Sequence, residues 1–358
     1  MGVGPHDSVR NERRSREVRV GGGHDRVMNA LTVLVGVYSP VAAWNIPASR
    51  VDRLRREFPD CTFLHATTEE RALELIPAAQ VAFMAELRPA HLDAATRLQW
   101  VHSPAAGVGG MLCPAMVKAP VAMTNSRGIS ADAIAEHVLA VTLAMFRKLP
   151  LVVRSQSLRH WAQDTILAPP GLRMLAGSCV LVVGLGSIGS ATTRRMAALG
   201  ARVIAIRRDV SRPAPDGVEQ VAPPARLRDL LPEADVVVIA APQTDATRGL
   251  MGAREFAAMR RDALLVNVSR GKLVDEAALA TALTDARTLG GAALDVFEHE
   301  PLSPDSPLWA LPNVLITPHM AGFRPDHWDA VTDLFADNLR RFSSGQPLRN
   351  VVNKEAGY

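Results

Sequence analysis

Residues 179–209, CVLVVGLGSIGSATTRRMAALGARVIAIRRD, decide the fold of this chain. Their pattern predicts a buried strand, a glycine-rich turn, a helix and a second strand. A GxGxxG turn in this context is typical of dinucleotide binding, because the free N–H groups of the helix start can receive phosphates. Gly184 would permit the tight turn, Gly186 the approach of a pyrophosphate, and Gly189 the close packing of helix on strand. A turn without a ligand and an S-adenosylmethionine site are the alternatives. The predicted cofactor contacts here are Gly184, Gly186, Ser187, Ile188 and Gly189.

The second strand of this stretch ends in two basic residues. About 20 residues past the glycines, NAD-binding proteins usually carry Asp or Glu for the ribose 2′-OH. Here Arg207 and Arg208 stand at that place. A guanidinium matches a phosphate in geometry and charge. We therefore predict that both arginines bind the 2′-phosphate of NADP. In the alternative, they are surface residues and Asp209 contacts the ribose.

Apolar and helical segments alternate along the rest of the chain. Strands interleaved with helices predict parallel sheets covered on both faces. We predict an α/β fold of two doubly wound domains, with a Rossmann cofactor domain inserted into a flavodoxin-like substrate domain. A nearly all-apolar helix at 130–149 is expected between the domains. The predicted parts are a disordered tail at 1–27, a substrate domain at 28–129 and 323–358, and a dinucleotide-binding domain at 130–322.

Bulk properties exclude several classes of protein. The chain has 358 residues and a net charge of +4, but six of its arginines lie in the first 26 residues, so the remainder is close to neutral. The three cysteines are far apart and form no CxxC pair, which excludes a disulfide framework and a zinc motif. The apolar run after the Arg-rich start vaguely resembles a signal peptide, but it serves better as a first strand. We predict a cytoplasmic protein with no nucleic acid, membrane or metal partner.

Several strands of the second series end in polar side chains. Arg270 follows the run DALLVNVS, Glu300 follows ALDVFEH, and His319 follows NVLITP. Because ligands bind at the carboxyl ends of strands in open α/β sheets, we expect these groups to converge. Arg270 would bind a carboxylate, His319 would exchange a proton, and Glu300 would orient the imidazole and raise its pKa. His299 is the alternative proton donor, but it is expected in a loop, whereas a strand end places His319.

At these motifs the chain resembles the D-isomer-specific 2-hydroxyacid dehydrogenases. The stretches VVGLGSIG, NVSRGKLVDEAAL, ALDVFEHEP and LITPHMAG carry the likeness, and together they are highly specific. The similarity is greatest to the glyoxylate and hydroxypyruvate reductase branch. By this resemblance, Arg270, Glu300 and His319 are the catalytic residues, and Asp295 contacts the nicotinamide carboxamide.

The resemblance also implies a substrate-binding loop. The stretch AAGVGG matches the family loop whose N–H groups receive the substrate carboxylate, near Ala106 and Gly107. The chain departs from the family at Gly109, where Asp is common, and at Arg207, where NAD-dependent members carry Asp. The departure at Arg207 argues against NAD, the usual cofactor of the family. Further cofactor contacts are expected at Pro242, Thr247 and Val268.

We therefore expect an oxidoreductase that transfers a hydride between NAD(P)H, with NADP preferred, and a small 2-oxo or 2-hydroxy acid. The resemblance implies a homodimer, and closure about hinges near Ser130 and Phe323 would bring the two domains together. Trp328 would wall the substrate pocket or serve as ordinary packing. A bulkier aryl or branched 2-oxo acid is an alternative substrate. A dinucleotide-sensing regulatory protein on the same fold is an alternative function.

Overall fold

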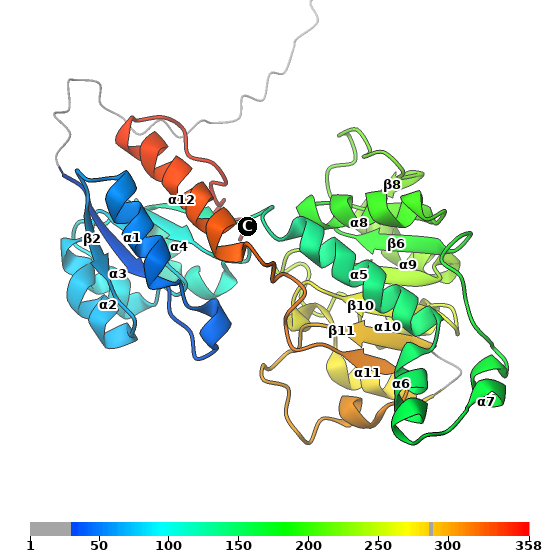
Figure 1. Cartoon of the computed structure of the whole chain (residues 1–358). Helices are drawn as coiled ribbons and strands as arrows, with labels where there is room; N and C mark the ends of the chain where they lie inside the picture. Colours follow the sequence, from blue (N-terminus) through cyan, green and yellow to red (C-terminus); the bar gives the residue numbers. More distant parts are fainter. Residues whose placement is uncertain (1–29, 286–288, 358) are drawn as a thin grey trace, which may run out of the picture.

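The computed structural model describes residues 30–285 and 289–357, so the expected tail at 1–27 lies outside the described residues. These residues form two parallel sheets that lie side by side (Figure 1). The first has the strand order β2-β1-β3-β4-β5, which is the flavodoxin order. The second has the order β12-β11-β10-β9-β6-β7-β8, the Rossmann order with one strand added at the edge. The predicted fold class is confirmed.

The first sheet is covered by helices from both ends of the chain. Its core joins Val33, Phe83 and Trp100 from the strands to Phe335 of the last helix, and the Phe83 and Phe335 rings stack 4.5 Å apart. The C-terminal tail also returns to this sheet, because Val352 N–H donates to the Met123 carbonyl. The elements are β1 Thr32–Gly36, α1 Ala48–Glu57, β2 Thr62–His65, α2 Glu69–Leu75, β3 Val81–Met84, α3 Pro89–Ala94, β4 Trp100–Ser103, α4 Pro114–Lys118, β5 Ala122–Asn125 and α12 His327–Ser343.

The second sheet is apolar on both faces. Along its strand β6, Leu181 and Val183 point into one core and Val180 and Val182 into the other. Strands buried on both sides need a continuous apolar run, which is why this stretch is so uniform in sequence. The strands are β6 Cys179–Val183, β7 Arg202–Ile206, β8 Gln220–Ala222, β9 Val236–Ile239, β10 Leu264–Asn267, β11 Gly291–Leu294 and β12 Val314–Ile316; the helices are α5 Ala131–Phe146, α6 Leu149–Ser157, α7 Gln163–Leu167, α8 Ser187–Ala198, α9 Leu227–Leu230, α10 Ala253–Ala258 and α11 Glu276–Thr284.

Short 3₁₀ helices complete both units: η1 Ala42–Trp44, η2 Ile76–Ala78, η3 Gly109–Met111, η4 Pro224–Arg226, η5 Leu231–Glu233, η6 Gly271–Leu273 and η7 Pro307–Ala310.

The apolar helix expected at 130–149 is α5, which spans Ala131–Phe146. It packs mainly on α8 and on strands β10 and β11 of the second sheet. Val138 lies in the core of that sheet, and Ala135 contacts Ala191 of α8, where small side chains let the helices approach closely. The sequence pattern indicated burial but could not say against which surface. No helix in the described ranges is long and apolar enough to cross a membrane.

Candidate active site

The glycine turn lies between β6 and α8, and each glycine has a distinct geometric reason. Gly184 has φ 105°, and a Cβ there would lie 2.5 Å from the Ala241 nitrogen. A Cβ at Gly189 would lie 1.9 Å from the Gly184 oxygen, so helix and strand could not approach as they do. Gly186 faces open space at the start of α8, where a phosphate could meet free N–H groups. Ser187 is exposed in the first turn of α8, and Ile188 packs against the apolar core.

At the end of β7, Arg207 has a partly paired guanidinium. Its Nη1 donates to the Pro213 carbonyl at 3.2 Å, whereas Nε and Nη2 are buried and have no hydrogen-bond partner among the described residues. Arg208 and Asp209 are exposed. The Asp209 carboxylate is turned back on its own loop, because it accepts from the Ser211 hydroxyl at 2.6 Å and from the Ser211 N–H, and these bonds lower its pKa.

Arg270 lies in a braced turn beyond β10. The strand ends at Asn267, two residues before the end of the run DALLVNVS. The Asn267 side chain donates to the Arg270 carbonyl at 3.1 Å and accepts from Ser269 N–H at 3.1 Å, so one amide closes the turn. Gly271 is required here, because a Cβ would lie 1.8 Å from the Phe297 carbonyl carbon. The strand stops early because this side chain takes the backbone partners of a further strand residue.

The guanidinium of Arg270 reaches the first unit. A Cβ at Gly107 would lie 1.9 Å from Arg270 Nη2, so this side chain lies directly against the Gly107 backbone. The end of β5 fixes the loop that contains Gly107, since the Asn125 side-chain amide donates to the Ala106 carbonyl at 2.6 Å. Burial lowers the pKa of Arg270 and the nearby Glu300 carboxylate raises it, but a guanidinium stays charged in proteins. The positive charge of Arg270 and the backbone of the Gly107 loop therefore meet at one place between the two sheets.

Glu300 and His319 form a direct pair. His319 Nδ1 lies 2.6 Å from Glu300 Oε2, and the other carboxylate oxygen accepts from Phe297 N–H at 3.0 Å. Burial would raise the pKa of Glu300, but the hydrogen bonds from His319 and Phe297 and the charges of His319 and Arg270 lower it overall. Glu300 is therefore a carboxylate at neutral pH and can support a charged imidazole. His299 is exposed, and the pairing with Glu300 belongs to His319.

The segment that carries His319 is held by Asp295, which is 2% exposed. Its carboxylate accepts from the Thr317 hydroxyl at 2.6 Å and from Met320 and Ala321 N–H, both at 3.0 Å. His319 itself has φ 51°, a left-handed conformation that costs free energy unless its surroundings enforce it. Sequence reasoning missed Asn267 and Thr317. Both lie within three residues of a predicted site residue, and that proximity was the only available signal.

The other predicted residues lie near the same edge of the second sheet. Thr247 donates to the Pro242 carbonyl at 2.7 Å, in the loop after β9, and Val268 is buried just beyond β10. Trp328 donates to the Ala43 carbonyl at 3.2 Å and packs edge-on against His327, so its observed contacts are packing contacts within the first unit. Its role as a pocket wall stays a prediction.

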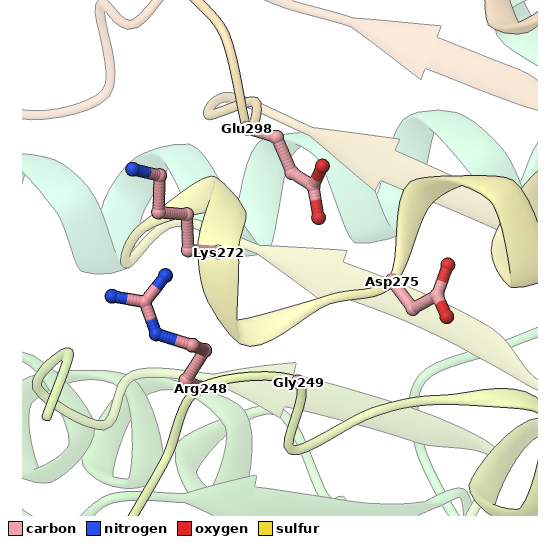
Figure 2. Close-up of a pocket in the computed structure, with 5 residues that line it drawn as sticks. All are labelled: Arg248, Gly249, Lys272, Asp275 and Glu298. Atoms are coloured by element: carbon pink, nitrogen blue, oxygen red, sulfur yellow. The ribbon is translucent and has the colours of Figure 1, made fainter. Parts of the chain in front are cut away.

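Figure 2 shows a separate cavity of about 270 Å³ behind the turn that follows Arg270. None of the predicted site residues lines it. Its charges are mixed, with two basic and two acidic side chains on different loops. Its lining residues are Arg248, Gly249, Lys272, Asp275 and Glu298. Among the residues that the structure describes, no group of three or more His, Cys, Asp or Glu could hold a metal ion.

Comparison with known proteins identifies the family. Residues 139–321 match the family described as D-isomer specific 2-hydroxyacid dehydrogenase, NAD binding domain. A glyoxylate reductase from Korarchaeum cryptofilum is 34% identical over 74% of this chain and 78% of its own length. A D-3-phosphoglycerate dehydrogenase from Archaeoglobus fulgidus is 34% identical over 73% of this chain, which spans only 48% of that relative.

A solved structure agrees. The NADPH-dependent glyoxylate/hydroxypyruvate reductase from Sinorhizobium meliloti, in complex with NADP and sulfate, superposes with a TM-score of 0.78 and 28% identity, over 92% of this chain and all of that one (100%). The chain therefore belongs to the D-isomer specific 2-hydroxyacid dehydrogenase family. As a member it is an NAD(P)-dependent oxidoreductase of 2-hydroxy acids with an NAD-binding domain.

Proposed function

We propose that this protein reduces a small 2-oxo acid of the glyoxylate or hydroxypyruvate kind, with NADPH as the preferred reductant. The observation that carries the proposal is the convergence of three groups at the edge of the second sheet. Arg270 lies against the Gly107 backbone, and Glu300 and His319 form a 2.6 Å pair beside it. A carboxylate anchor next to a supported proton donor suits a 2-oxo acid, which has a carboxylate next to its ketone.

In the proposed mechanism, the substrate carboxylate binds Arg270 and the N–H groups near Ala106 and Gly107. A guanidinium binds a carboxylate through two parallel hydrogen bonds, so this contact also orients the ketone. His319, as an imidazolium, donates its proton to the ketone oxygen, and Glu300 stabilises the charge before transfer. The bound nicotinamide would supply the hydride. In the reverse direction His319 accepts the proton of the hydroxyl group.

The proposed preference for NADP rests on Arg207. Two of its guanidinium nitrogens are buried without a partner in the described part of the chain, and a 2′-phosphate would supply acceptor oxygens for them. Asp209 is held by Ser211, which argues against the alternative in which it contacts the ribose. The similar Sinorhizobium meliloti reductase is described in complex with NADP. The glycine turn and the start of α8 would hold the pyrophosphate, while Pro242, Thr247, Val268 and Asp295 are proposed around the nicotinamide half.

We also propose that the domains divide at 129/130 and at 322/323. The two connections lie side by side, because Arg324 donates to the Ile129 carbonyl at 2.9 Å. A Cβ at Gly322 would lie 3.5 Å from the Ser130 side chain. Paired crossing points of this kind suit a hinge, and closure would exclude water from Arg270.

The proposed assembly is a homodimer through the second unit. Helices α6 and α7 project from it (Figure 1). They and the turn between them expose large apolar side chains, such as Trp161 at 87% and Leu158 at 72%. Exposed apolar patches of this kind mark interaction surfaces. Sedimentation of the purified protein checks this assignment.

An assay of NADPH and NADH oxidation with a panel of 2-oxo acids tests the function. We expect the highest kcat/KM with NADPH and either glyoxylate or hydroxypyruvate. A higher value for an aryl or branched 2-oxo acid would keep the enzyme class and change the substrate. Tight dinucleotide binding without turnover of any acid would favour the regulatory alternative. The intact set of Arg270, Glu300 and His319 argues against that alternative, because a regulator has no need of it.

A further inference from the structure

The segment 317–321, which carries His319, is bonded along its length to one residue. Asp295 accepts hydrogen bonds from the hydroxyl of Thr317 and from the N–H groups of His319, Met320 and Ala321. Of these bonds, the one from Thr317 is the shortest, at 2.6 Å, and the only one made by a side chain. Thr317 is also the first residue of the segment, so this bond determines how the chain leaves β12.

The Thr317 hydroxyl has a second partner on a distant element. Its oxygen lies 3.2 Å from Nε2 of His137, which is on α5 and 180 residues away in sequence. An ionised carboxylate accepts only, so Thr317 must donate its single proton to Asp295. Its oxygen then accepts from His137, which must carry a proton on Nε2. Burial lowers the pKa of His137, against the opposing charge of Asp295, so the neutral imidazole with its proton on Nε2 fits this role.

This chain of hydrogen bonds joins three elements at one point. His137 comes from α5, Asp295 follows β11, and Thr317 follows β12. Each hydrogen bond has one direction: the His137 imidazole donates to the Thr317 hydroxyl, and this hydroxyl donates to the Asp295 carboxylate. A half-buried hydroxyl whose proton and oxygen are both bonded in this way has one preferred orientation, and it passes that orientation to the backbone attached to it. The left-handed backbone at His319, two residues on, needs such a constraint to persist.

We infer that Thr317 is a positioning residue: its hydroxyl, held between His137 and Asp295, fixes the segment that aims His319 at the substrate. The inference rests on the proposed role of His319 as proton donor. Thr317 itself touches neither substrate nor dinucleotide in this account. Asp295, which is proposed near the nicotinamide, keeps its bonds from Met320 and Ala321 N–H when the Thr317 hydroxyl is removed. The loss of the hydroxyl should therefore act mainly through the orientation of His319 and change cofactor binding little.

The test compares Thr317→Val with Thr317→Ser. Valine keeps the shape and removes the hydroxyl, whereas serine keeps both hydrogen bonds. We expect Thr317→Val to lower kcat by about tenfold to a hundredfold, as small misplacements of catalytic groups do. KM for the 2-oxo acid and the NADPH dissociation constant, measured by fluorescence titration, should change by less than about threefold. Thr317→Ser should keep kcat within about threefold of the wild type, since its hydroxyl can make the same bonds.

Combining Thr317→Val with a second substitution tests whether its effect acts through His319 and shares the contact with His137. In His319→Gln, Thr317→Val should cause no additional loss, because the residue that it positions is gone. His137→Leu should lower kcat less than Thr317→Val does and add nothing to it, because both changes break the same chain.

The inference is overturned by any of three results: an unchanged kcat in Thr317→Val, a weakened NADPH affinity with normal kcat at saturation, or a full further loss in the His319→Gln background. Full activity of His319→Gln alone would instead overturn the proposed function.

Discussion

The ends of two strands in the second sheet are prepared in different ways. At the end of β12, Thr317 and the His319 segment are bonded to Asp295, which follows the neighbouring strand β11. At the end of β7, Arg207 keeps two buried guanidinium nitrogens without a partner among the described residues. Both ends carry a residue of the candidate site. One end is braced by the protein itself, and the other leaves two buried donors without a partner among the described residues.

Under the proposed function, this difference matches the two proposed roles. A proton donor must be oriented before the substrate arrives, because any reorganisation during the reaction would raise the barrier. A residue that selects a ligand gains discrimination when its donors are satisfied by the right ligand and left unpaired by the wrong one. The comparison therefore predicts large effects on kcat at the β12 end and effects on cofactor choice at the β7 end.

The largest effect is expected at the braced end. His319→Gln should lower kcat by about 10² to 10⁴, because the proposed proton donor is lost. Dinucleotide affinity should stay nearly unchanged, and steady-state kinetics with a fluorescence titration check both values. His299→Gln is the matched control, since His299 is exposed and has no contact with Glu300 of this kind. A greater loss in His299→Gln would show that the wrong histidine was chosen.

The β7 end should respond in cofactor choice. A charge-assisted hydrogen bond contributes about 1.5 to 3 kcal/mol, which corresponds to a roughly tenfold to hundredfold preference for NADPH. Arg207→Asp should reverse that preference, because it replaces attraction of the phosphate by repulsion. The ratio of kcat/KM for the two cofactors is the measurement. Arg208→Asp should change this ratio less. Equal kcat/KM values for NADPH and NADH in the wild type would contradict the comparison.

A smaller effect is expected at Arg270, the proposed anchor of the substrate carboxylate. Arg270→Lys keeps the charge but loses the planar pair of donors, so KM for the 2-oxo acid should rise by about tenfold or more. Arg248→Lys makes the same exchange at an exposed position in the neighbouring cavity and should leave KM within about twofold. If Arg270→Lys keeps the wild-type KM, Arg270 is only part of a surface turn.

The smallest effect concerns stability and pH. Burial raises the pKa of Glu300, but the hydrogen bonds from His319 and Phe297 hold this pKa below its usual value overall. A carboxyl group with a lowered folded pKa stabilises the protein above its unfolded pKa of about 4.3, and this stability is lost as the pH falls through the folded pKa. Glu300→Gln should therefore unfold a few degrees below the wild type near neutral pH. Thermal unfolding curves should converge in acid, and a gap that persists there would contradict this assignment.

Much of the candidate site could be predicted because it follows local rules. The glycine turn, the arginines after β7 and the polar residues after β10, β11 and β12 are each recognisable from a strand pattern and its next few residues. The same local rules failed where short elements carry weak patterns. Strand β8, with three residues, and helices α6 and α7 were not anticipated. The early end of β10 was missed because the Asn267 side chain, and not an apolar pattern, stops the strand.

The sequence by itself determined the two alternating series, the parallel sheets and the order in which the site residues arrive, because apolar periodicity and the geometry of parallel strands are properties of short segments. Only the tertiary structure decided that Arg270 lies against Gly107, that two Arg207 nitrogens are buried without a partner among the described residues, and that His137 contacts Thr317. The contacts of Arg270 and of His137 join residues far apart in the chain. They depend on how helices and sheets pack in three dimensions, and that packing leaves no periodic trace in the residues that it brings together.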